Sequence, residues 1–240
     1  MLPLRATVTD EAAACAYDCA GADGVATSRR VLTPARPTVA AMAGAALFHY
    51  GRLAGNGLRA LREVRAALAA APTERVLDFG CGTGLFCLAV PGEYVGIDLD
   101  PAYVAFASWR WGNPRRRFEV VDLAHLATGA GFDAAMMVNC VHHLSDDAAN
   151  DVLARLAGLV RSRFVLVDMD PDTSNRVQRF LLDHDRGEFI RSPADLRRLL
   201  APHFWIREER VFRNTSHTTV QILFTCEPHP HRSVDATRLN

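Results

Sequence analysis

A short apolar run that ends in an acid and continues into spaced glycines determines the local fold around residue 80. The run is Val76-Leu77-Asp78-Phe79-Gly80-Cys81-Gly82-Thr83-Gly84. It predicts a buried strand and then a turn whose backbone approaches another group closely, because glycine allows positive φ and has no Cβ. We expect a helix over about 85–90 that directs its positive end at the same place, so a nucleotide-like ligand is the first hypothesis. A tight strand-to-helix loop without a ligand is the alternative.

Three further strands are predicted, and each ends on polar residues. Residues 93–100 form a second strand that closes on an acid, and the spacing of about 20 residues from the first acid suits a carboxylate that holds a ribose diol in a βαβ nucleotide site. Residues 118–123 form a third strand that ends on an acid. Residues 132–139 form a fourth, followed by Cys140-Val141-His142-His143-Leu144.

With these motifs the chain resembles the class I S-adenosylmethionine-dependent methyltransferases. The resemblance covers roughly residues 75–227 and rests on four motifs in order, namely Asp78 to Gly84, Gly96-Ile97-Asp98, Asp122-Leu123 and His142-His143-Leu144. Four ordered motifs are far more specific than one. A dinucleotide dehydrogenase fits less well, because its fingerprint is G-x-G-x-x-G whereas the glycines here are spaced G-x-G-x-G.

The resemblance implies S-adenosylmethionine as cofactor and S-adenosylhomocysteine as product. The glycine loop lines the methionine end of the cofactor, and Asp78 contacts its ammonium directly or through water; a helix cap is the alternative role for Asp78. Asp98 accepts hydrogen bonds from both ribose hydroxyls, and Asp122 accepts from the adenine amino group unless it is a solvated turn acid. The full set of expected cofactor residues is Tyr50, Asp78, Gly80, Cys81, Gly82, Gly84, Asp98, Leu99, Asp122, Leu123 and Asn139.

Two histidines and two arginines are the candidates for catalysis and acceptor binding. In the resembling family the position of His142 and His143 lies near the transferred methyl group, where a neutral imidazole can take a proton from the acceptor. The alternative is a structural histidine that lies beneath the substrate site and holds the loop in shape through a hydrogen bond. Arg186 and Arg191 are candidates for an anion clamp on the acceptor, or for an internal salt-bridge set with Asp183, Asp185 and Glu188.

Strands and helices alternate through most of the chain, which predicts an α/β three-layer sandwich. Apolar periodicity over 38–71 indicates one or two helices. Residues 1–71 are therefore expected to form a helical lid segment and 72–240 the core, with a lid insertion at about 170–204. A fifth strand is predicted at 163–168, and two closing strands at 205–212 and 218–225 form a hairpin-like pair. The resemblance implies seven strands in the order 3-2-1-4-5-7-6, with the last-numbered strand antiparallel.

The amino-acid composition excludes several classes of partner and cofactor. The 27 basic and 27 acidic residues cancel, so no global field attracts nucleic acid or anionic lipid. Lysine is absent, which excludes a lysine Schiff base and a Walker-type phosphate loop. The six cysteines form no disulfide framework, and with no signal peptide pattern or membrane-length apolar run we expect a cytoplasmic protein. No metal is expected, because Asn139 stands where catechol-type enzymes place an acid.

The sequence therefore predicts a methyltransferase that acts on a small molecule at O, N or C, as a monomer or homodimer, in bacterial secondary or glycan metabolism. Three alternatives stay open at this point. The fold can use the cofactor for a cyclisation without methyl transfer, it can methylate RNA or protein, or it can bind the cofactor as a regulator without chemistry. The acceptor is not readable from the sequence.

Overall fold

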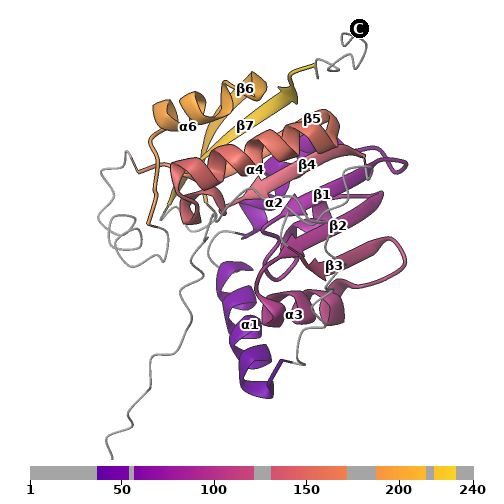
Figure 1. The fold of residues 1–240 in the computed structure, drawn as a ribbon. Coiled ribbons are helices and arrows are strands. Elements are labelled where there is room, and N and C mark those ends of the chain that lie inside the picture. The colour runs from indigo at the N-terminus through magenta and orange to yellow at the C-terminus, as the bar shows by residue number, and fades with distance from the viewer. Residues whose placement is uncertain (1–36, 54–56, 122–130, 172–187, 215–218, 231–240) are drawn as a thin grey trace, which may run out of the picture. The chain divides into compact units, whose positions relative to one another are not determined.

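In the computed structural model the alternating pattern forms one mixed β-sheet with helices packed on its faces (Figure 1). The structure describes residues 37–53, 57–121, 131–171, 188–214 and 219–230. Among them are seven strands in the order β3-β2-β1-β4-β5-β7-β6, as predicted. The strands are β1 (Arg75–Phe79), β2 (Glu93–Asp98), β3 (Arg116–Val120), β4 (Phe132–Val138), β5 (Val160–Met169), β6 (Phe204–Arg213) and β7 (Val220–Pro228).

Strand direction divides the sheet into two parts. The pairs that join β1, β2, β3, β4 and β5 are parallel, whereas β7 runs antiparallel to both β5 and β6. The predicted antiparallel last strand and the predicted closing pair are both confirmed. Because carboxyl ends of parallel strands meet at one edge, the polar residues after β1, β2, β4 and β5 gather there.

Two apolar clusters lie on opposite faces of the sheet and give the molecule its three layers. Successive residues of a strand point to opposite faces, so Val76 joins one cluster and Leu77 the other. The face of Leu77 is covered by α4 (Asp146–Leu159) and α6 (Pro193–Leu200). The face of Val76 is covered by α2 (Leu58–Leu68) and α3 (Pro101–Trp111). The predicted three-layer α/β fold is confirmed.

Three helices begin at a residue whose side chain caps them. The side chain of Asp100 accepts from the backbone N–H groups of Ala102 and Tyr103 at the start of α3, with Pro101 in the first turn. Ser145 caps α4 in the same way, and Ser192 caps α6. The helical segment predicted over 38–71 divides into α1 (Val39–Arg52) and α2.

The helix predicted at about 85–90 is present, but it is not an α-helix. The segment is a five-residue 3₁₀ helix, η2 (Leu85–Ala89). Gly84, in the left-handed region, precedes it without a side-chain cap, and β2 begins at Glu93, so the chain has no room for a longer helix. Without two full turns η2 has no developed N-terminal dipole, so the positive helix end expected beside the loop is weak.

Several strand boundaries also differ from expectation. β2 ends at Asp98 because Asp100 already caps α3. β3 begins and ends earlier than predicted, at Arg116–Val120, and β5 extends beyond 163–168 at both ends. Asp122, Leu123, Arg186 and residues 172–187 of the 170–204 insertion lie outside the described residues.

Candidate functional site

The glycine loop after β1 has a backbone that only glycine adopts readily. Gly80, Gly82 and Gly84 have φ of 69°, 52° and 76°. A Cβ on Gly80 would lie 2.3 Å from Cys140 Sγ, and one on Gly84 would lie 2.6 Å from Phe118 Cε1. The loop is tied to β2, since the N–H groups of Gly80 and Cys81 both donate to the Ile97 carbonyl, at 2.9 and 3.0 Å. Its conformation is therefore set by tight packing as well as by sequence.

Asp98 lies at the carboxyl end of β2, against this loop. Its Oδ2 accepts from the Gly82 N–H at 2.7 Å and its Oδ1 from the Asp100 N–H at 2.9 Å. Burial raises the pKa of the Asp98 carboxyl, and these backbone hydrogen bonds oppose the rise. Each oxygen has a second lone pair, so the carboxylate can also accept from two hydroxyls of a diol. Leu99, half exposed, offers an apolar surface beside it.

Asp78 is buried beneath the loop and has a partner that the sequence did not suggest. The Tyr94 hydroxyl donates to Asp78 Oδ2 at 2.6 Å. Burial raises the pKa of Tyr94 well above its ordinary value, and the nearby Asp78 carboxylate raises it further, so the phenol keeps its proton and donates. The residue before η2 is Gly84, so Asp78 does not serve as the helix cap that the alternative required. Cys81 is also buried, and burial raises its thiol pKa, which excludes a reactive thiolate.

Helix α1 reaches the glycine loop through His49, a residue that sequence reasoning missed. His49 is 2% exposed, and its Nδ1 lies 2.9 Å from Thr83 Oγ1. Trp111 Nε1 at the end of α3 donates to the Thr83 carbonyl at 3.2 Å. The predicted cofactor residue Tyr50 is half exposed and packs edge-on against His49. A polar residue inside the otherwise apolar run of α1 was the available signal.

The carboxyl end of β4 carries the second left-handed element of this edge. Asn139 has φ of 51°, which asparagine tolerates better than most residues. Its N–H donates to the Val167 carbonyl at 2.8 Å, and its Oδ1 accepts from Gln221 Nε2 at 2.8 Å. Gln221 is fully buried on β7 and was not predicted. Its hydrogen bond fixes the Asn139 side chain at the end of β4.

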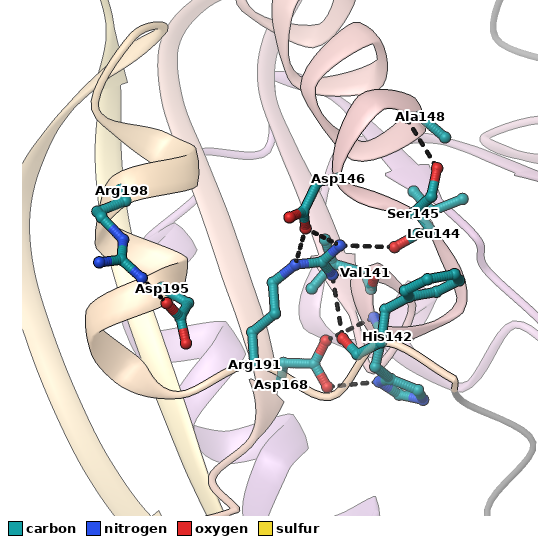
Figure 2. A network of polar contacts seen from close by, with 11 residues as sticks. Val141, His142, Leu144, Ser145, Asp146, Ala148, Asp168, Arg191, Asp195 and Arg198 are labelled. Carbon is teal, nitrogen blue, oxygen red and sulfur yellow. Dashed lines mark hydrogen bonds and ion pairs between the residues drawn. The ribbon is translucent and has the colours of Figure 1, made fainter.

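His142 and Asp168 form a buried pair at the same edge (Figure 2). His142 lies in the one-turn helix η4 (Val141–His143), and Asp168 lies near the end of β5. His142 Nδ1 is 2.5 Å from Asp168 Oδ1, and the His142 backbone N–H donates to Asp168 Oδ2 at 3.1 Å. Both residues are 3% exposed. The carboxylate therefore fixes both the backbone and the ring of His142, and it favours the tautomer with the proton on Nδ1.

His143 differs from His142 in its surroundings. It is exposed, and its ring centroid lies 4.2 Å from that of His142. The two predicted catalytic histidines are thus adjacent, and His142 is the one that Asp168 orients. Sequence reasoning did not predict this role of Asp168.

Arg191 is placed under the histidine turn and not at an open surface. Its guanidinium pairs with Asp146, at 2.7 Å from Nη2 to Oδ1, and also donates to the carbonyls of Val141 and Leu144. Among the described residues, the acid that pairs with it is Asp146. Of the three acids considered at 183–188, only Glu188 lies within the described residues.

Comparisons with known proteins agree with this geometry. Residues 76–163 match a family model described as a methyltransferase domain. An O-methyltransferase from Penicillium expansum is 32% identical over 127 residues, which are 48% of this chain and 45% of that relative. The chain thus matches less than half of that relative's length.

Solved structures share the fold at low identity. Magnesium protoporphyrin IX methyltransferase from Synechocystis PCC 6803 with bound SAH has a TM-score of 0.56 at 22% identity, over 71% of this chain and 83% of that one. Geranyl diphosphate C-methyltransferase from Streptomyces coelicolor A3(2) has a TM-score of 0.59 at 13% identity, over 71% of this chain and 76% of that one. Together with the strand order, these neighbours show that the core of the chain has the class I methyltransferase fold, and residues 76–163 match the methyltransferase domain model.

Two further features concern the described residues alone. Within them, no three histidine, cysteine or acidic side chains are grouped so that they would hold a metal ion. None of their helices is both long and apolar enough to cross a membrane.

Proposed function

We propose that this protein transfers a methyl group from S-adenosylmethionine to a hydroxyl group of a small molecule. The observation that carries the proposal is the joint placement of the glycine loop, Asp98 and the His142–Asp168 pair at the carboxyl edge of one parallel sheet. Open α/β sheets bind ligands at this edge. The relative named as an O-methyltransferase and the neighbours with bound SAH support the proposal.

We call the glycine loop, Asp78 and Asp98 the cofactor half of the site, and these residues fit the cofactor well. The carboxylate of Asp98, already fixed by Gly82 and Asp100, accepts from the two ribose hydroxyls. The positive φ of Gly82 and Gly84 lets the loop backbone approach the methionine part without a Cβ between them. Asp78 supplies the negative charge nearest the loop interior, which suits an ammonium held directly or through water.

We call the His142 turn and its partner Asp168 the acceptor half of the site, and we propose that these residues contact the acceptor. When bound, S-adenosylmethionine would supply an electrophilic methyl group: a lone pair of the acceptor oxygen forms the new O–C bond, and the electron pair of the broken C–S bond stays on the sulfur. His142, with its proton on Nδ1 held by Asp168, has its lone pair on Nε2 and takes the hydroxyl proton there. Asp168 stabilises the imidazolium that results, and the proton then passes to solvent. The remaining acceleration comes from alignment and exclusion of water.

A small-molecule acceptor in bacterial biosynthesis is the substrate class we propose. The chain has no net charge that would attract RNA. The neighbours whose names mention magnesium protoporphyrin IX and geranyl diphosphate carry the same fold. Neither of those two compounds is proposed as the substrate here, because the likeness extends to the fold alone.

The test is incubation with S-adenosylmethionine that carries a trideuterated methyl group, together with a panel of phenols, sugars and other hydroxylated metabolites. We expect a product that carries the label and an equal amount of S-adenosylhomocysteine by mass spectrometry. Substrate converted without label while the cofactor stays intact would contradict methyl transfer and favour the cyclase. Cofactor that binds and is never consumed with any acceptor, including RNA and protein, would favour the regulator.

A further inference from the structure

The turn that carries His142 has little internal support. It is a three-residue 3₁₀ helix, closed by two backbone hydrogen bonds, His143 N–H to the Cys140 carbonyl at 3.0 Å and Leu144 N–H to the Val141 carbonyl at 3.1 Å. So short a helix is not stable by itself, because nucleation fixes several dihedrals for each hydrogen bond formed. The precise placement of His142 against Asp168 therefore needs contacts from elsewhere in the chain.

Those contacts come from Arg191, 8% exposed, which precedes α6 (Figure 2). Its Nη1 donates to the Val141 carbonyl at 2.9 Å and its Nη2 to the Leu144 carbonyl at 2.7 Å. One planar guanidinium thus holds the residues on both sides of the histidine pair. Nearby, the Phe189 N–H donates to the His142 carbonyl at 3.0 Å, so the same short segment also holds His142 itself.

The guanidinium is in turn held in place. Asp146 Oδ1 accepts from Arg191 Nε at 2.9 Å and from Nη2 at 2.7 Å. The Phe189 carbonyl accepts from Nη1 at 3.1 Å. Asp146 lies in the first turn of α4, the helix that follows the histidine turn directly. The arginine therefore joins the turn, the start of α4 and the segment before α6 in one network.

We propose that Arg191 is the positioning residue of this site: it holds the η4 turn so that His142 stays in register with Asp168. The proposal rests on the proposed function for the role of His142 in turnover, but its geometric part is independent of any substrate. It also replaces the anion clamp considered for Arg191, because the donors of the guanidinium are directed at protein oxygens. Lysine cannot substitute, since a single ammonium does not reach two carbonyls and a carboxylate in the same plane.

The experiment compares four variants of the full chain. Arg191→Met removes the fork, and Arg191→Lys keeps the charge without the fork. Asp146→Ala removes the exposed acid that orients the guanidinium and leaves both turn carbonyls in contact with it. Arg198→Met is the matched control, because Arg198 is an exposed arginine on α6 that pairs with Asp195. Calorimetric titration with S-adenosylhomocysteine checks that each variant is folded.

The first readout is the proton NMR signal of the His142 Nδ1–H, shifted downfield by the short bond to Asp168 and assigned by its loss in His142→Gln. We expect the signal in wild type and in Arg198→Met, and its loss or exchange broadening in both Arg191 variants. In Asp146→Ala we expect a smaller change of this signal than in the Arg191 variants. An unchanged signal in Arg191→Lys, or in a folded Arg191→Met, would overturn the proposal.

The second readout separates positioning from simple destabilisation. Once an acceptor is known, we expect kcat to fall roughly 10- to 100-fold in Arg191→Lys, because small displacements of a catalytic group have effects of this size. The acceptor KM and the affinity for S-adenosylhomocysteine should stay within about twofold of wild type, a margin well below a 1.4 kcal/mol change. A rise in the acceptor KM with kcat unchanged would instead support an anion clamp and overturn the positioning role. If no acceptor is methylated yet the NMR signal depends on Arg191, the proposed function fails and the positioning geometry stands.

Discussion

The two halves of the candidate site are built in different ways. In the cofactor half, the contacts beneath the loop span few residues: Gly82 to Asp98 and Tyr94 to Asp78 are each 16 residues apart, whereas the His49–Thr83 contact from α1 spans 34 residues. In the acceptor half they join distant segments: His142 to Asp168 over 26 residues, Leu144 to Arg191 over 47 and Asn139 to Gln221 over 82. The first half is mostly backbone geometry, and the second is mostly a network of side chains.

Because of this difference, the two halves tolerate different kinds of substitution. A backbone cradle made by glycines needs one particular φ at each position, so it leaves a readable pattern and fails when a side chain is added. A side-chain network needs all its members, and a missing partner leaves a buried polar group unsatisfied. We therefore expect substitutions in the cofactor half to change binding, and substitutions in the acceptor half to change turnover.

The largest effect is expected in the acceptor half. His142→Gln should lower kcat by about 100- to 10,000-fold, the usual contribution of a general base, with cofactor affinity retained. His203→Gln is the control, since His203 contacts Asn150 and lies outside the site. His143→Gln should have a smaller effect than His142→Gln, because the His143 side chain is exposed whereas His142 is buried and bonded to Asp168. A larger fall of kcat in His143→Gln than in His142→Gln would instead assign the general base to His143.

Next in size is the glycine loop. Gly84→Ala forces a left-handed residue and places a Cβ 2.6 Å from Phe118 Cε1, so we expect the free energy of unfolding to fall by ~2 kcal/mol and cofactor binding to weaken. Urea denaturation measures the first and calorimetry the second. Gly44→Ala is the matched control, because a Cβ there has nothing within 4 Å and its helix should gain ~0.5–1 kcal/mol. Equal stability of the two variants would contradict the proposed role of the Gly84 backbone.

Asp98→Asn should weaken S-adenosylhomocysteine binding by about 10- to 100-fold, the equivalent of losing a hydrogen bond to a charged group. Glu93→Gln removes the same charge from the other end of β2 and should leave the affinity unchanged. Comparable losses in the two variants would indicate a general charge effect and contradict the ribose contact.

The raised pKa of Asp98 gives this contact a pH dependence. Burial favours the neutral carboxyl, so protonation begins at a higher pH than for an exposed aspartate. Affinity for S-adenosylhomocysteine should therefore fall as the pH is lowered through that raised pKa, more steeply in wild type than in Asp98→Asn. The stability of the unliganded protein has the opposite sign: the contribution of Asp98 decreases as the pH rises from the ordinary pKa of an aspartate to the raised one. Titrations over a pH series, with parallel urea denaturation, measure both slopes.

The smallest effect is expected where α1 meets the loop. His49→Ala removes the hydrogen bond to Thr83, and a net ~1 kcal/mol corresponds to a cofactor affinity about five times weaker. Leu47→Ala, at an exposed position of the same helix, should have no such effect. An unchanged affinity in His49→Ala would show that α1 does not support the loop.

The same contrast explains what the sequence could predict. The strand order follows from the family resemblance and the positive φ of the glycine loop from a local pattern, and both are confirmed. The helix expected at 85–90 is present but is a 3₁₀ helix, and its type was not readable from sequence periodicity.

The missed residues share one physical reason. Tyr94 has the apolar character of any strand residue until its hydroxyl is seen to meet Asp78. Gln221 and Arg191 acquire their roles only when β7 and the segment before α6 are brought to the ends of β4 and η4. Such pairings depend on tertiary contacts that no window of the sequence records.

We claim that the cofactor half determines binding and the acceptor half determines turnover. This claim is tested most directly by titrating S-adenosylhomocysteine into wild type, Asp98→Asn and His142→Gln in one calorimetric series. We expect wild type and His142→Gln to bind one equivalent with the same affinity, and Asp98→Asn to bind at least about tenfold more weakly. Absence of binding to wild type, or an equal loss in both variants, would contradict a cofactor site that is built separately from the catalytic turn.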